Sequence, residues 1–104
     1  MSAPVAINVT VDGSAVDLYT AGSAKAQLTT LAVTNTSGGV LTIDIWKRNS
    51  TNTTSWYIAY TLSLAAGETK SLNHALVTFT TSGEKLRAQA SGTSIDVVGS
   101  VIEY

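Results

Sequence analysis

Apolar and polar residues alternate along most of this chain, in short runs separated by Gly, Ser, Asn and Asp. The clearest run covers residues 55–64, where alternate positions are apolar. A period of two is typical of a strand with one apolar face, and no run shows the period of a helix of ordinary length. We expect the apolar face of this strand to lie inward and to consist of Trp56, Ile58, Tyr60, Leu62 and Leu64.

Turn residues divide the rest of the chain into further strands. They are expected within residues 5–11, 15–19, 25–35, 40–48, 69–72, 85–90 and 94–104, while 73–81 fits neither period. Asp12-Gly13 is a hairpin signal between the first two, and the change of apolar phase near Thr29-Thr30 indicates a bulge. The pattern predicts a single domain over residues 1–104, an antiparallel β-sandwich of about eight strands with either a jelly-roll or an Ig-like topology.

The strands within 40–48 and 55–64 are expected to pair around the polar link between them. This register sets Leu41 opposite Leu62, Ile43 opposite Tyr60, and Ile45 opposite Ile58 on the inner face. It also places Trp46 beside Tyr57 on the outer face, where two large rings could stack on a sugar or anchor a protein partner. The alternative is a cross-strand pair that only stiffens the hairpin.

Composition narrows the function classes. Charged residues make up 12% of the chain, the net charge is −1, and the six cations are spread out, so we expect no nucleic-acid partner. Cysteine is absent, which excludes disulfides and thiolate metal sites. The first residues lack the basic start and long apolar run of a secretory signal or a membrane helix, so we expect synthesis in the cytoplasm and no membrane partner. Because low charge limits the solubility of a free monomer, we expect the chain to be part of an assembly.

No catalytic constellation stands out. His74 is the sole histidine, it has no nucleophile motif beside it, and a loop position explains it better than catalysis. The carboxylates are scattered without the spacing of a calcium loop, although a glycosidase pair can be assembled from distant positions. We therefore expect no enzymatic activity, no cofactor and no metal.

Four segments, taken in order, carry a resemblance to a known group of proteins. They are Leu31-Ala-Val-Thr-Asn35, Leu64-Ala-Ala-Gly-Glu-Thr69, Gly83-Glu-Lys-Leu-Arg-Ala-Gln-Ala-Ser91 and the ending Val97-Val-Gly-Ser-Val-Ile-Glu-Tyr104. In this order the chain resembles small structural proteins of tailed bacteriophages, which are capsid-decoration, cement or tail-associated virion proteins. The resemblance implies a β-sandwich without enzymatic activity, located in the virion after synthesis in the host cytoplasm. It transfers no site residue.

The functional expectation is a capsid decoration or cement subunit that binds the major capsid protein or other virion proteins, as a homo-oligomer with a trimer favoured. A tail, baseplate or fibre subunit is the alternative, and a carbohydrate-binding adhesion module is the alternative from another class. The candidate protein or glycan contacts are Trp46, Lys47, Arg48, Asn49, Asn52, Tyr57, Val98, Ile102 and Tyr104.

Overall fold

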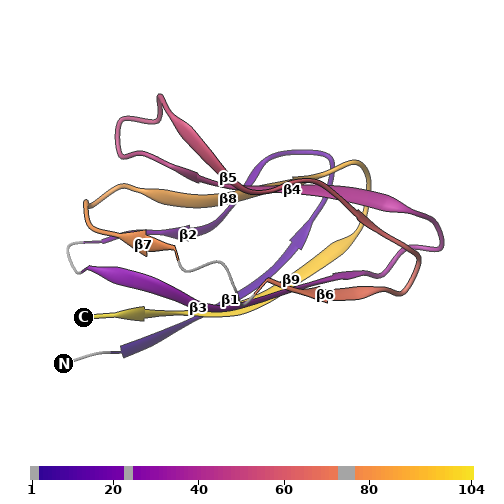
Figure 1. Ribbon diagram of the computed structural model, residues 1–104, viewed down its shortest axis with the longest axis horizontal. Helices are drawn as coiled ribbons and strands as arrows, with labels where there is room; N and C mark the ends of the chain where they lie inside the picture. Colours follow the sequence, from indigo (N-terminus) through magenta and orange to yellow (C-terminus); the bar gives the residue numbers. More distant parts are fainter. Residues whose placement is uncertain (1–2, 23–24, 73–76) are drawn as a thin grey trace.

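A computed structural model describes residues 3–22, 25–72 and 77–104, which form two layers of strands (Figure 1). These residues contain nine strands and no helix. The strands are β1 (Ala3–Val11), β2 (Val16–Thr20), β3 (Ala26–Asn35), β4 (Leu41–Arg48), β5 (Ser55–Leu64), β6 (Thr69–Ser71), β7 (Thr78–Phe79), β8 (Lys85–Ala90) and β9 (Ile95–Glu103). No helix in the described part of the chain is long and apolar enough to cross a membrane. His74 lies outside the described residues.

The strand order identifies the topology. One sheet has the order β1-β9-β3-β6, with β7 also paired to β3, and the other has the order β2-β8-β4-β5. Every pair is antiparallel, and β4 and β5 form the one hairpin-connected pair among the described strands. Two antiparallel sheets wound in this way, with first and last strands side by side, form a jelly roll. The β-sandwich prediction is confirmed, and its topology is that of a jelly roll and not of an Ig-like sandwich.

The Asp12-Gly13 turn does not form the predicted hairpin. β1 belongs to one sheet and β2 to the other, so the turn carries the chain across the sandwich. The Asp12 carboxylate accepts a hydrogen bond from the Ser14 backbone N–H at 2.8 Å, which closes the turn locally. The turn is thus closed by a hydrogen bond to its own Asp12 side chain. The strand with which β2 pairs is decided instead by the burial of the apolar faces of the two sheets.

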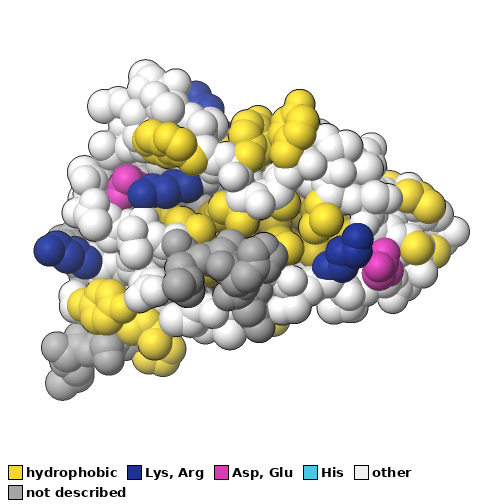
Figure 2. All heavy atoms as spheres, in the orientation of Figure 1, with side chains coloured by type: hydrophobic (Ala, Val, Ile, Leu, Met, Phe, Trp, Pro, Cys, Tyr) yellow, Lys and Arg dark blue, Asp and Glu magenta, His cyan; other side chains and the backbone are white. Residues whose placement is uncertain are grey.

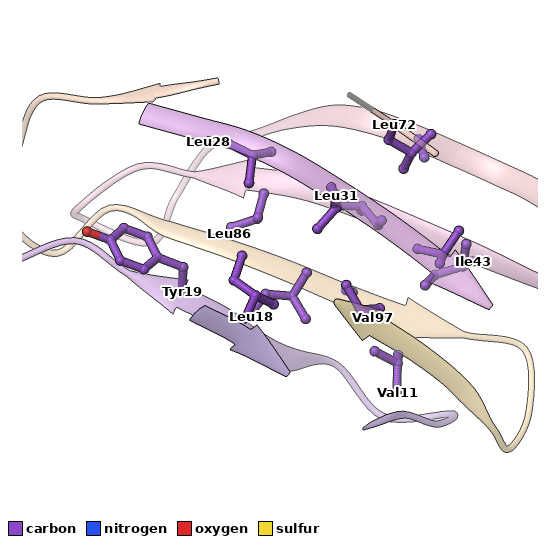
Figure 3. Close-up of a cluster of buried hydrophobic side chains, with 14 of the residues drawn as sticks. Val11, Leu18, Tyr19, Leu28, Leu31, Ile43, Leu72, Leu86 and Val97 are labelled. Carbon is purple, nitrogen blue, oxygen red and sulfur yellow. The ribbon is translucent and has the colours of Figure 1, made fainter. Parts of the chain in front are cut away.

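The core fills the space between the two sheets and follows the alternation of most strands (Figure 3). Leu86, Ala88 and Ala90 of β8 point inward, and each is buried. In β9, Ile95, Val97 and Val101 are fully buried, and the strand is central between β1 and β3. Its other face is also apolar, with Val98 and Ile102, which is common in a central strand. The inner face of β1 adds Ile7 and Val11.

The predicted bulge in β3 is present. The β3–β9 register shifts between Leu28 and Thr30, so Leu28 and Leu31 both point into the core although only two residues lie between them. At the same place the Thr30 carbonyl approaches Gly99 of β9 so closely that a Cβ on Gly99 would lie 2.3 Å from it. The glycine is required by this close approach of two backbones.

The β4–β5 register agrees with the prediction only near the loop. Trp46 is opposite Tyr57 as expected, but two register shifts follow. Beyond them Leu41 is opposite Leu64, Ile43 opposite Leu62, and Ile45 opposite Ala59, so the three predicted inner pairs are wrong. The extra residues in β5 are accommodated by bulges, which strict alternation cannot reveal.

Candidate interaction surface

Three aromatic side chains cluster on the outer face of the β4–β5 pair, and we call Trp46, Tyr57 and Tyr60 the aromatic surface. The rings of Trp46 and Tyr57 lie 5.7 Å apart, and those of Tyr57 and Tyr60 lie 5.0 Å apart in an edge-to-face arrangement. Trp46 is only 7% exposed, whereas Tyr57 is 53% and Tyr60 72% exposed. Trp46 therefore lies beneath the two tyrosines, and the tyrosine rings form the exposed part of the aromatic surface. Figure 2 shows hydrophobic side chains gathered over this layer.

A bulge turns Tyr60 outward, against its predicted inner position. Thr61 has a φ of 52°, which is strained for a β-branched residue. Its backbone N–H donates to the Asp44 carboxylate at 2.6 Å, which holds the strained segment against β4. Sequence reasoning missed Tyr60, because only a pairing register reveals this bulge, and the small Ala59 opposite Ile45 is the one local hint.

Arg48, Asn49 and Asn52 stabilise the loop between β4 and β5. The Arg48 guanidinium donates to the Asn52 side-chain and backbone oxygens, both at 2.7 Å, and to Ser55 Oγ at 2.7 Å. The Asn49 carboxamide oxygen accepts the backbone N–H groups of Thr53 and Thr54 at 2.8 and 3.0 Å. These predicted contact residues therefore hold the loop in shape through their own hydrogen bonds.

Lys47 points inward and bridges the two sheets, away from the aromatic surface. Its Nζ lies 3.2 Å from the Glu84 carboxylate and donates to the Thr78 carbonyl at 2.7 Å. It also lies 5.6 Å from the ring centre of Phe79 and 5.9 Å from that of Trp56. Trp56 is 53% exposed, so its predicted place in the core is wrong.

Glu84 is the buried partner in this bridge. Burial acts to raise its pKa, but two backbone N–H groups, of Thr81 and Thr80, and the Lys47 ammonium outweigh it and lower the pKa below the ordinary 4.5. The carboxylate thus stays ionised at neutral pH. Together with Lys47 it closes one end of the sandwich.

Charges beside the aromatic surface are paired with one another. Arg87, the β8 neighbour of Trp46, has its Nε 2.7 Å from the Asp17 carboxylate, and Lys85 Nζ lies 3.5 Å from the same group. The surface therefore offers aromatic faces flanked by neutralised charges, which is the composition of a contact patch in many protein interfaces.

The predicted contacts of the last strand lie on the other sheet. Val98 and Tyr104 are 54% and 59% exposed, and Ile102 is half-buried on the same outer face. The Tyr104 hydroxyl donates to the Gln27 carboxamide oxygen at 2.8 Å. Because the aromatic surface belongs to the opposite sheet, the structure divides the predicted contact set into two separate surfaces.

In the described part of the chain, no three His, Cys, Asp or Glu side chains are placed to hold a metal ion. A shallow depression of about 240 Å³ runs along β1 and β9. Its lining is Asn8, Val9, Thr10, Asp96, Val97 and Val98, with one carboxylate that already accepts a hydrogen bond from the Thr10 hydroxyl at 2.8 Å.

No protein-family model matches the sequence, and neither does any curated protein. Solved structures do share its fold. The chain aligns over 99% of its length with VP2 of the infectious bursal disease virus subviral particle, at 14% identity and a TM-score of 0.68. It aligns over its whole length with the subunit of the disulfide-linked pili of Bacillus endospore appendages, at 16% identity and a TM-score of 0.59. A chain of the cyanophage Pam1 capsid asymmetric unit matches 99% of it, at 11% identity and a TM-score of 0.50.

These likenesses show the fold. They also differ in how much of the other chain is matched: 32% of VP2, 86% of the appendage subunit and 84% of the cyanophage chain. The chain thus spans about a third of the virus coat protein but most of the two smaller chains. Viral capsid proteins are prominent among its structural neighbours.

Proposed function

We propose that this chain is a non-enzymatic structural subunit of a virion, and specifically a decoration or cement subunit of a phage capsid. The observation that carries the proposal is a jelly roll that matches 84% of a chain in a phage capsid asymmetric unit and also matches part of a second virus's coat protein. The resemblance of its sequence segments to tailed-phage structural proteins supports the same role. Its partner would be the major capsid protein, and a trimer is the expected oligomer.

The aromatic surface is the contact that we assign to this partner. Tyrosine and tryptophan carry a large share of binding energy at interfaces, particularly where they are rigid and flanked by groups that exclude water. Tyr57 and Tyr60 are both exposed by more than half, and the buried Trp46 ring and the bulge at Thr61 fix their positions. A rigid aromatic pair loses little side-chain entropy when it is covered.

Co-sedimentation of the tagged protein with shells purified from the producing lysate tests this assignment. The double change Tyr57→Ser and Tyr60→Ser should weaken binding at least tenfold without lowering the melting temperature appreciably, because both side chains are largely exposed. Val40→Ser, a matched loss of an exposed apolar side chain at 67% exposure, should leave binding unchanged. Equal binding by both variants would remove the aromatic surface from the interface.

A filament or fibre subunit is the second candidate function. The match to 86% of a pilus subunit favours it, since that chain is also one sandwich of similar length. This chain has no cysteine, so a filament of it would depend on non-covalent contacts. Electron microscopy of the concentrated protein would reveal regular filaments if this candidate is right.

The alternative of a carbohydrate-binding module depends on the same tyrosines. Exposed aromatic faces beside Asp44 and the Asn49–Thr54 loop could stack on a sugar ring. A glycan array distinguishes it: specific signals that disappear with Tyr57→Ser and Tyr60→Ser would favour glycan binding over shell binding, and a blank array would remove it.

A further inference from the structure

The four sheet edges of this sandwich are not equally protected against pairing with another strand. An exposed edge presents unpaired backbone groups, and proteins usually protect it by short strands, bulges or charges. β6 and β7, at one edge, have three and two residues. β2 is short, carries a bulge after Asp17, and bears the ion pairs of that residue. β5 carries two register shifts.

β1 has little of this protection. It is nine residues long, contains no charged residue, and pairs with β9 from Ala3 to Val11 without a register shift. In the described part of the chain, no backbone hydrogen bond of residues 3–11 is made outside the β1–β9 ladder. Its one protective residue is Pro4, at the very start of the strand. β1 is therefore a long, regular and uncharged open edge.

Pro4 indicates which backbone groups face this edge. Proline in an edge strand has its nitrogen on the open side, because it has no N–H to give to the ladder. Backbone direction alternates along a regular strand, so Ala6, Asn8 and Thr10 share the direction of Pro4 and present N–H and C=O groups outward. Val5, Ile7 and Val9 then bond to β9.

The side chains of β1 suit a second copy of the same strand. On the inner face, Val5, Ile7 and Val9 are symmetric about Ile7, which is 1% exposed. Val5 and Val9 pack against the core but remain half-exposed at the edge, so an added strand would cover them. On the outer face, Ala6 and Asn8 are small and uncharged, so they would neither repel an added strand nor clash with it.

We infer that β1 is a strand-addition site at which two copies of this chain pair, antiparallel, about a two-fold axis at Ile7. Ala6 of one copy is then opposite Asn8 of the other and exchanges both backbone hydrogen bonds with it. Val5 lies opposite Val9, which extends the apolar core across the contact. Such a contact between identical copies is isologous and closes as a dimer. The inference concerns the isolated chain in solution, whereas the trimer of the proposed function is expected on the capsid shell, so the two are tested separately.

Site-resolved amide exchange, measured from micromolar to millimolar protein beside sedimentation equilibrium, tests this inference. At low concentration the Val5, Ile7 and Val9 amides should exchange slowly and those of Ala6, Asn8 and Thr10 rapidly. At high concentration the protein should be a dimer, and the second set should slow at least tenfold. A monomer throughout, a trimer, or outward amides that stay rapid in the dimer would overturn the inference.

A variant pair isolates the backbone contribution. Asn8→Pro removes an outward N–H and no bond to β9, so dimerisation should weaken at least tenfold, whereas Asn8→Ala, which keeps the N–H, should dimerise like the natural chain. Equal dimerisation by both folded variants would contradict the inference. Should Asn8→Pro fail to fold, the alternating exchange of the natural chain decides alone.

Discussion

β1 and β5 are edge strands of similar length in opposite sheets, but the alternation of apolar residues predicts the inner face of β1 better than that of β5. β1 keeps an unbroken register with β9, and its alternate residues point where the sequence pattern predicts. β5 shifts its register twice against β4 and turns Tyr60 outward. Alternation therefore identifies the inner face only of a strand without bulges, and the bulged edge is the one that presents aromatic side chains.

The largest effect that separates the two strands should come from truncation of one inner isoleucine in each. Ile7→Ala in β1 removes a side chain that is 1% exposed and should lower the free energy of unfolding by about 3–4 kcal/mol. Ile58→Ala in β5 removes a half-buried one and should cost about 1–2 kcal/mol. Urea denaturation of both variants measures the difference, and equal losses would mean that the two strands are equally packed.

The regular register of β1 depends on its neighbour β9, and Gly99→Ala tests that dependence. Gly99 is opposite Ile7, and a new Cβ would collide with the Thr30 carbonyl, so we expect a loss of about 3 kcal/mol. Gly13→Ala is the matched control, since a Cβ there meets nothing within 4 Å. A melting temperature for Gly99→Ala as high as that of the control would show that the two backbones do not approach so closely.

In β5 the strain at Thr61 should be measurable as a gain. Thr61→Gly removes about 1–2 kcal/mol of left-handed strain and adds about 0.5–1 kcal/mol of backbone entropy cost, so the protein should become more stable by about 0.5–1 kcal/mol. Ser63→Gly, in the same strand without a positive φ, should destabilise it slightly. Thermal unfolding of the pair shows the sign, and a loss at both positions would contradict the bulge geometry.

The smallest effect concerns stability in acid and depends on the ion pair between Glu84 and Lys47, the residue opposite Trp56 of β5. Because folding lowers the pKa of Glu84, its contribution is complete above the ordinary pKa of 4.5 and is lost as pH falls through the lowered value. Urea midpoints of the natural chain should therefore decline below that pH. Glu84→Gln should be less stable at neutral pH and show a smaller decline, and identical pH profiles would remove this carboxylate from the account.

The sequence predicted eight of the nine strands, the two-layer sandwich and the β3 bulge, because each leaves a local mark in the apolar pattern; it did not predict β7, which lies in the segment 73–81 that fits neither period. The jelly-roll crossing after Asp12-Gly13 was not predictable in this way, since the same turn chemistry suits a hairpin and a change of sheet. Of the candidate contacts, Tyr57 and Val98 lie on exposed outer faces. The inward direction of Lys47 was not predictable, because its ion pair with Glu84 depends on a residue far along the chain.

Quantitative mass spectrometry of purified particles, giving the ratio of this chain to the major shell protein, tests the proposed virion role most directly. A decoration subunit should be present in a ratio typical of a stoichiometric shell component. A ratio far lower would move the chain to a tail or fibre, and absence from the particles would contradict the proposed virion role.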